Sequence, residues 1–213
     1  MPEGWQSVRL DDIEPIAVDG GKLLWRPLRR TLDVGAFGIN AYVAPNAGDD
    51  VVEEHTETTY GHEEVYLVLA GRATFTVDGT TLDAPAGTAV FIRDPALKRH
   101  ARADEPGTAV LAVGGPRDAA YEPSAWEWAF AAEKHRAAGE YDAMVNEIAA
   151  GLALYPENPS LLYDLGCAEA LAGHPEDALA HVRRALELKP EWKEHALADP
   201  DLVSVRELPD ILL

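Results

Sequence analysis

Cysteine is almost absent from this sequence. Cys167 is the only one in 213 residues, so no disulfide can form within the chain. Such sparse use of cysteine is typical of proteins from reducing compartments. Residues 1–6 contain neither a basic start nor an apolar stretch, which argues against a secretory signal peptide. We therefore predict a cytoplasmic protein.

Long apolar runs and basic side chains are also scarce. No run approaches the roughly 18 apolar residues that a membrane helix needs. Lys and Arg number 18 against 37 Asp and Glu, which gives a net charge of −19. An acidic surface repels phosphate backbones and anionic lipids, so we expect neither a nucleic acid nor a membrane as partner. The apolar content of 47% is enough for a substantial core in one large or two small domains.

Two common catalytic patterns are missing. The sequence has no Gly-rich phosphate loop of the G-x-x-x-x-G-K type, and none of its serines lies in a nucleophile elbow. The densest group of chemically useful side chains is His55, His62 and Glu64, directly before an apolar run. Imidazole and carboxylate groups held on a rigid strand are suitable ligands for a divalent metal.

The first half of the chain has the pattern of an all-β domain. Ala73, Phe75 and Val77 alternate with polar residues, and Asp78-Gly79 then predicts a hairpin turn. About eight to ten short strands of this kind, with turn signals every eight to twelve residues, reach residue 116. This spacing predicts a sandwich or barrel over residues 1–116.

The second half has helical spacing and is self-similar. Residues 125–158 and 159–192 align without a gap at a period of 34, so that Gly139 falls on Gly173 and Pro156 on Pro190. Each unit predicts a helix, a turn with glycine and a second helix. We place a linker at residues 117–124, and two repeats with a partial capping helix at 125–213.

The repeat resembles the tetratricopeptide repeat. In the second copy the family's signature positions hold Leu162, Leu165, Gly166, Ala168, Gly173, Ala178, Ala185 and Pro190. The resemblance implies a grooved helical scaffold for a protein partner or for self-association. Because three or more repeats are usual in a free-standing array, structural support of the β domain is an equally open alternative.

The β half resembles the cupins, which have small jelly-roll barrels of the double-stranded β-helix type. Glu64 and Gly71 match one cupin motif, and Gly87, Pro95 and His100 match the second. The resemblance implies a metal held by Glu64 and His100 together with a His-X-His pair. That pair is absent from its usual place, which holds residues 57–60, so we predict His55 and His62 in its stead.

The resemblance leaves two functions open. The first is a small-molecule-binding protein with a metal site formed by His55, His62, Glu64 and His100; the metal is Fe, Mn, Ni, Zn or Cu. The second is a metal-dependent enzyme with oxygenase or isomerase chemistry. A metal-free barrel with structural histidines is the third alternative. We expect a homodimer, because cupins often pair, and a ligand site lined by Tyr60, Tyr66, Asn40 and Phe91.

Overall fold

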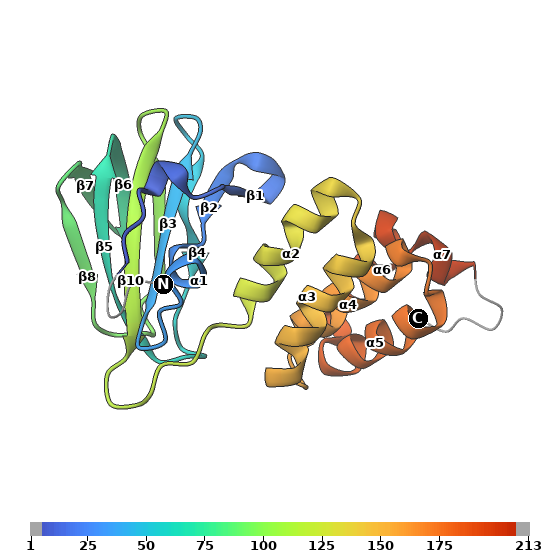
Figure 1. The fold of residues 1–213 in the computed structure, drawn as a ribbon. Helices are drawn as coiled ribbons and strands as arrows, with labels where there is room; N and C mark the ends of the chain where they lie inside the picture. The colour runs from blue at the N-terminus through green and yellow to red at the C-terminus, as the bar shows by residue number, and fades with distance from the viewer. Residues whose placement is uncertain (1–5, 208–213) are drawn as a thin grey trace. The chain divides into compact units, whose positions relative to one another are not determined.

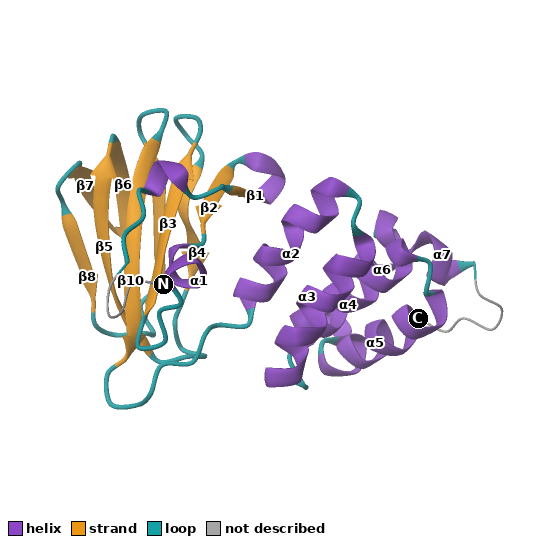
Figure 2. Ribbon diagram, in the orientation of Figure 1, coloured by secondary structure: helices purple, strands orange, loops and turns teal. Residues whose placement is uncertain are grey.

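The computed structural model describes residues 6–207, which form two compact units. The boundary lies between Pro123 and Ser124. The first is built mainly of strands and the second of helices (Figures 1 and 2). We call them the β unit and the helical unit.

The β unit contains two antiparallel sheets. The larger sheet has the order β1 (Ile16–Val18), β2 (Leu23–Arg26), β3 (Gly38–Ala44), β10 (Thr108–Pro116), β5 (His62–Ala70) and β8 (Ala89–Ile92). The smaller sheet has the order β4 (Asp50–His55), β9 (Arg99–Ala103), β6 (Arg72–Val77) and β7 (Thr80–Pro85).

The pairing of the last eight strands defines a jelly roll. Strand β3 pairs with β10, β4 with β9, β5 with β8, and β6 with β7. The chain therefore forms one long antiparallel ribbon that folds over into two sheets, which is the jelly-roll architecture. The ribbon closes at the predicted turn, where Asp78 and Gly79 both have positive φ angles of 46° and 81°.

The core of the β unit lies between the two sheets. Successive side chains of a strand point to opposite faces, so Tyr66 and Val68 on β5 meet Phe75 on β6 in one buried cluster. Glycine is required at one tight point of this unit. Gly71 has a φ of 70°, and a Cβ there would lie 2.5 Å from the hydroxyl oxygen of Thr108.

Three short helical segments precede the jelly roll. They are η1 (Leu10–Asp12), η2 (Asp19–Gly21) and α1 (Leu28–Leu32). The sequence showed no helical period in this region, because a single turn is too short to display one. Pro27 precedes α1, and Asp33 ends it in the left-handed conformation.

The helical unit consists of two helical hairpins followed by short segments. Its long helices are α2 (Trp126–Ala138), α3 (Tyr141–Leu154), α4 (Pro159–Ala172) and α5 (Pro175–Leu188), and η3 (Pro190–Trp192), α6 (Lys193–Ala198), η4 (Pro200–Leu202) and α7 (Val203–Arg206) follow. Gly139 and Gly173 end α2 and α4 with φ angles of 71° and 86°, as expected of left-handed helix caps. No helix among residues 6–207 is long and apolar enough to cross a bilayer.

Small residues let neighbouring helices approach closely. A Cβ on Gly151 of α3 would lie 2.6 Å from the ring of Trp128 on α2. A Cβ on Gly166 of α4 would lie 2.5 Å from Val182 on α5. The two hairpins thus repeat the helix–turn–helix pattern that the 34-residue period predicts, whereas their tetratricopeptide nature stays a prediction.

Candidate metal centre

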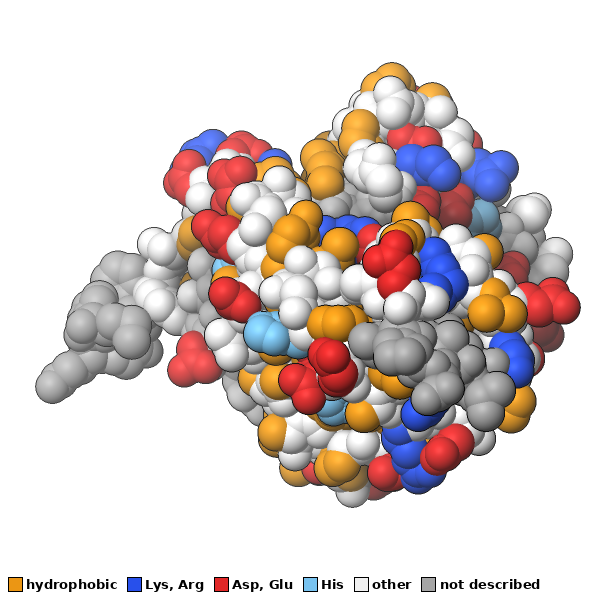
Figure 3. All heavy atoms as spheres, turned by 90° about the vertical axis from the view of Figure 1, so that its right-hand side faces the viewer, with side chains coloured by type: hydrophobic (Ala, Val, Ile, Leu, Met, Phe, Trp, Pro, Cys, Tyr) orange, Lys and Arg blue, Asp and Glu red, His pale blue; other side chains and the backbone are white. Residues whose placement is uncertain are grey.

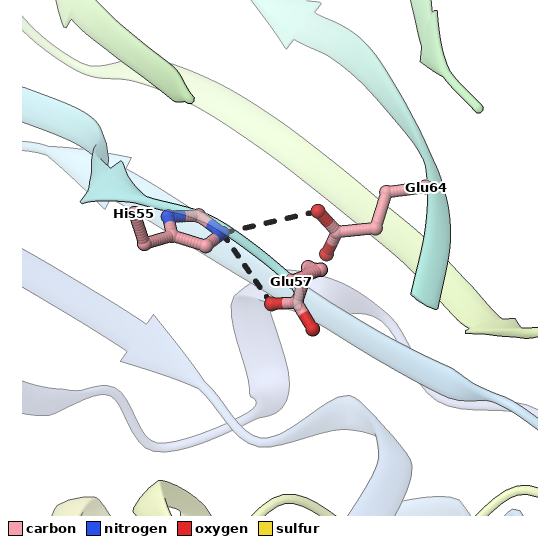
Figure 4. A group of neighbouring side chains, drawn as sticks. All are labelled: His55, Glu57 and Glu64. Carbon is pink, nitrogen blue, oxygen red and sulfur yellow. Dashed lines mark ion pairs between the residues drawn. The ribbon is translucent and has the colours of Figure 1, made fainter. Parts of the chain in front are cut away.

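A polar cluster lies in the β unit between the end of β4 and the start of β5, which belong to different sheets. Its members are His55, the last residue of β4, Glu57 in the following loop, and Glu64 near the start of β5. One nitrogen or oxygen of each lies within 4.8 Å of the others. Figure 4 shows the imidazole of His55 directed at both carboxylates.

Hydrogen bonding fixes the orientation of His55. Its Nδ1 lies 2.7 Å from the carbonyl oxygen of Glu53, and because a carbonyl only accepts, Nδ1 carries a proton and donates it. The other nitrogen, Nε2, lies 3.5 Å from Oε1 of Glu57 and 3.8 Å from Oε2 of Glu64. In the neutral imidazole Nε2 therefore offers its lone pair on the side of the two carboxylates.

A tight turn holds Glu57 in place. Its backbone N–H donates to the carbonyl oxygen of Pro95 at 2.9 Å, and the N–H of Gly61 donates to the carbonyl oxygen of Glu57 at 2.7 Å. The side chain is buried, with Oε1 beside His55 and Oε2 at 3.2 Å from Nδ1 of His62. Glu57 therefore links the two histidines.

Glu64 is held by two neighbours. The hydroxyl of Tyr66, two residues along the same face of β5, donates to Oε2 of Glu64 at 2.5 Å. Nη1 of the fully buried Arg99 lies 3.7 Å from the same oxygen. This buried cation partly neutralises the negative charge of the cluster.

The electrostatics of the cluster favour positive charge at His55. Burial by itself lowers the pKa of His55. The neighbouring Glu64 carboxylate, the hydrogen bond to the carbonyl of Glu53 and the charge of Glu57 outweigh that effect and raise the pKa above its usual value. Burial raises the pKa of Tyr66 well above its usual value, with Glu64 adding to the shift. Tyr66 therefore stays protonated as a donor.

His62 lies beside this cluster rather than within it. Its side chain is buried and contacts Oε2 of Glu57. It stacks on the ring of Tyr60 and lies against the tilted ring of Tyr121, with ring centroids 5.5 Å apart in each case. The structure thus gives His62 a position from which it orients Glu57. It does not place His62 in the group of donors that surrounds Nε2 of His55.

The position of His100 corrects the expectation that it joins the ligands. On β9 the buried residues are Arg99, Ala101 and Ala103, and they alternate with His100 and Arg102. A shift of one residue moves a strand side chain to the opposite face. His100 therefore points away from the interior, where its Nε2 pairs with Asp50 at 2.8 Å, and Arg99 takes the inward position.

The four expected lining residues also divide between the two faces. Tyr66 and Asn40 are buried, at 2% and 5% exposure, and the Oδ1 of Asn40 has no hydrogen-bond partner among the described residues. Tyr60 stacks on His62. Phe91 is 49% exposed and carries the guanidinium of Arg93 over its ring, so it belongs to the outer face of β8 and not to the interior.

Glu57, a member of the cluster, and Arg99, which borders it, were not predicted as part of the site. Glu57 occupies a position that cupins often give to histidine, which singled it out without deciding its role. Arg99 had a clearer signal. Ala101 and Ala103 follow it at intervals of two, and this alternation places Arg99, and not His100, on the buried face.

No family model matches the sequence, and no curated protein matches it. Among solved structures, the chain is similar to a cupin protein from Bacteroides fragilis, with 18% identity, a TM-score of 0.41, and coverage of 57% of this chain and 92% of that one. The β unit has a cupin-like fold. Its strand order shows this jelly roll directly.

Two further similar structures carry the names of enzymes. One is a cupin-superfamily sugar phosphate isomerase from Silicibacter pomeroyi, with 17% identity, a TM-score of 0.43, and coverage of 53% of this chain and 76% of that one. The other is a predicted oxalate decarboxylase from Thermotoga maritima, with 20% identity, a TM-score of 0.42, and coverage of 53% and 100%. At these identities the likeness concerns the fold and not the activity.

Proposed function

We propose that the β unit binds a small molecule at an interior divalent-metal site whose protein ligands are His55, Glu57 and Glu64. The observation that carries the proposal is the orientation of His55. Its Nδ1–H is anchored on a backbone carbonyl, and its Nε2 faces two carboxylates. A metal-binding histidine is commonly held in this way, because the hydrogen bond at one nitrogen fixes the tautomer that frees the other.

The donor set fits a divalent transition metal. Glu57 is buried and the side chain of Glu64 is 13% exposed. Oε2 of Glu57 lies 3.2 Å from Nδ1 of His62 but has no hydrogen-bond partner among the described residues. One imidazole and two carboxylates suit Fe, Mn, Ni, Zn and Cu alike, so the donors do not select among these metals. A bound metal would supply a Lewis acid next to the ligand. Tyr66 would hold Glu64 and His62 would hold Glu57.

Metal-dependent catalysis, such as oxygenase or isomerase chemistry, is the second candidate. Catalysis is favoured by the number of proposed protein ligands, which is three. Metal sites with three protein ligands leave a coordination position open for water or substrate. Tyr66 would keep a proton next to that position, since its hydroxyl lies 3.5 Å from Nε2 of His55. Turnover of a small acid or carbonyl compound by the metal-loaded protein would establish this function.

Metal content per chain tests the proposed site. Untagged protein is loaded with each of the five metals, dialysed and measured by elemental analysis, beside the variants His55→Ala and His100→Ala. We expect about one equivalent in the parent and in His100→Ala, and none in His55→Ala, because only His55 belongs to the cluster. Equal metal content in all three proteins, or none in the parent, would refute the site.

For the helical unit we propose a scaffolding role through two tetratricopeptide-like repeats. Its helices α3, α4 and α5 border a shallow, open groove, lined by Leu152, Leu165, Glu169, His181 and Arg184 among others. Acidic, basic and apolar side chains are interspersed on the face in Figure 3.

The same scaffold is also a candidate interface for the expected homodimer. Analytical ultracentrifugation of the full chain tests whether the homodimer forms. A monomer at all concentrations would exclude the homodimer.

A further inference from the structure

Arg99 is a fully buried cation with unused hydrogen-bonding capacity. It opens β9 and is the direct cross-strand neighbour of His55 on β4, so both side chains enter the interior from the same sheet. Its exposure is 0%. Arginine is almost never fully buried unless its charge and its donors are matched by partners.

The partners of Arg99 within the chain are incomplete. Nη2 donates to the carbonyl oxygen of Asp94 at 3.3 Å. Nη1 lies 3.7 Å from Oε2 of Glu64, which is an ion pair but too long for a hydrogen bond. Among the described residues, neither Nε nor Nη1 has a hydrogen-bond acceptor. Buried hydrogen-bond donors in proteins nearly always have an acceptor. Arg99 is therefore suited to bind a hydrogen-bond acceptor that is not part of the chain.

The charges around the site indicate what that acceptor is. Arg99, Glu57 and Glu64 together carry one negative charge when both histidines are neutral. A divalent metal on the two carboxylates would turn this into one positive charge, and a net charge in a buried site is costly. A ligand with a single negative charge would restore neutrality. This charge argument holds only if the proposed metal site exists. The unpaired hydrogen-bond donors of Arg99 are present whether or not a metal binds.

We propose that Arg99 binds the carboxylate of a small monocarboxylate ligand in the interior of the β unit. The guanidinium supplies charge-assisted hydrogen bonds through the nitrogens that the chain leaves unpaired. Arg99 is therefore a specificity-determining residue that selects organic acids over neutral molecules of the same shape. The reaction class, if there is one, is left open by this assignment.

Calorimetry on the zinc-loaded full chain tests the proposal. The probes are acetate, propionate and lactate, their neutral counterparts acetamide, propionamide and lactamide, and inorganic phosphate. We expect at least one carboxylate to bind about tenfold or more tightly than its amide, which is the difference expected for a hydrogen bond between charged groups. Phosphate, which is mostly a dianion at pH 8, should bind more weakly than that carboxylate.

Two variants assign the effect to Arg99. Arg99→Gln should lose at least about tenfold in carboxylate affinity while its zinc content stays that of the parent. Arg102→Gln is the matched control, because Arg102 lies on the same strand but points outward and is 60% exposed; its affinity should match the parent's. If Arg99→Gln fails to fold, Arg99→Lys keeps the charge and should bind the carboxylate more weakly than the parent.

Nuclear magnetic resonance of the arginine side chains adds a measurement that a purely structural role would not affect. The Nε–H signal of Arg99, assigned by its loss in Arg99→Lys, should shift when the carboxylate is added and not when the amide is added. The proposal is overturned if no carboxylate binds, if Arg99→Gln binds as well as the parent, or if phosphate binds best.

The outcomes also separate this proposal from the proposed metal site. Zinc content is measured for every protein independently of ligand binding. If the parent takes up no zinc, the metal site fails by itself, and the carboxylate titration is then read on the metal-free protein. Carboxylate binding that depends on Arg99 in that protein supports the role of Arg99, and its absence overturns it.

Discussion

The two units each contain a cluster of side chains of the kind that binds metals, but the two clusters differ in how many of their donor atoms the chain itself already uses. In the β unit, Oε2 of Glu57 has no hydrogen-bond partner among the described residues. In the helical unit, Cys167, Asp199 and Asp201 approach one another as closely as His55, Glu57 and Glu64 do in the β unit. Their oxygens, however, are already engaged. Asp199 accepts from the hydroxyl of Tyr163 at 2.8 Å, and Asp201 accepts from both terminal nitrogens of Arg136 at 2.6 and 2.8 Å.

The protonation state of the sulfur separates the clusters further. Burial raises the pKa of the Cys167 thiol, and the neighbouring Asp199 adds to the shift, whereas a metal needs the thiolate. At His55 the pKa is raised as well, but by the attraction of two carboxylates for positive charge, and the hydrogen bond to Glu53 directs Nε2 at those carboxylates. A metal cation would replace the proton there. The comparison teaches that closeness of donor atoms does not by itself make a metal site, because donor atoms that the chain's own hydrogen bonds and ion pairs already use are not free for a metal.

The largest effect is expected for Glu64→Gln. This change removes a metal ligand and the counter-charge of the buried Arg99, so it should lower the free energy of unfolding by about 3 kcal/mol and abolish zinc uptake. Urea unfolding and elemental analysis measure the two effects. The control is Glu63→Gln, since Glu63 precedes Glu64 on β5 and its side chain points to the other face. Similar losses in both variants would contradict our account of the cluster.

A smaller effect is expected for Asp201→Asn in the helical unit. The change weakens the paired hydrogen bonds to the partly exposed Arg136 and should cost about 1–2 kcal/mol in the free energy of unfolding. Zinc content should not change, because this cluster is structural. A loss of bound zinc in Asp201→Asn would remove the contrast between the two clusters.

Asp164 in α4 offers a test of burial by pH. Burial, with a contribution from Glu133, raises the pKa of Asp164 to about 7, from 3.8. Because the folded pKa is raised, the folded state binds the proton more tightly. The resulting stability is fully present below about pH 4 and is lost as the pH rises through about 7.

Asp164→Asn should remove this dependence. We expect the variant to be more stable than the parent at pH 8, by about 1 kcal/mol once the partial exposure of Asp164 is taken into account. At pH 3, which lies below the ordinary pKa of 3.8, the two proteins should be about equally stable, since the carboxyl is then mostly protonated in both the folded and the unfolded parent. Thermal unfolding at pH 8 and pH 3 measures the difference. A difference that persists at pH 3 would indicate an effect of packing instead.

The smallest effect concerns the thiol itself. Cys167 is 6% exposed and its pKa is raised, so it should not react with Ellman's reagent in the native protein at pH 8, and should react fully in urea. Cys167→Ala should contain as much zinc as the parent. Rapid reaction in the native state would mean that the cluster in the helical unit is more open than its contacts indicate.

Much of the fold followed from local patterns. The alternation of residues 73–77 and the turn at Asp78-Gly79 predicted the β6–β7 hairpin, and the glycines at 139 and 173 predicted the ends of α2 and α4. These features depend on side-chain period and on backbone angles that glycine adopts without strain. They are therefore encoded within a few residues of sequence.

The site was predicted less completely. His55 and Glu64 belong to the donor cluster, His62 lies beside it, and His100 points away from it. The error at His100 came from counting the spacing of a motif instead of following the alternation through Ala101 and Ala103. Glu57 could not have been placed, because its position depends on a hydrogen bond from its backbone to Pro95, 38 residues away.

The sequence by itself determined the two-part architecture, most of the strands, the long helices and the acidic, disulfide-free character of the chain, because each follows from composition or from short-range period. Only the tertiary structure decided which ionisable groups face one another. Pairing β4 with β9 puts His55 beside Arg99, and folding β5 onto the other sheet brings Glu64 to them. Such contacts join residues far apart in the chain, and a shift of one residue in register reverses them.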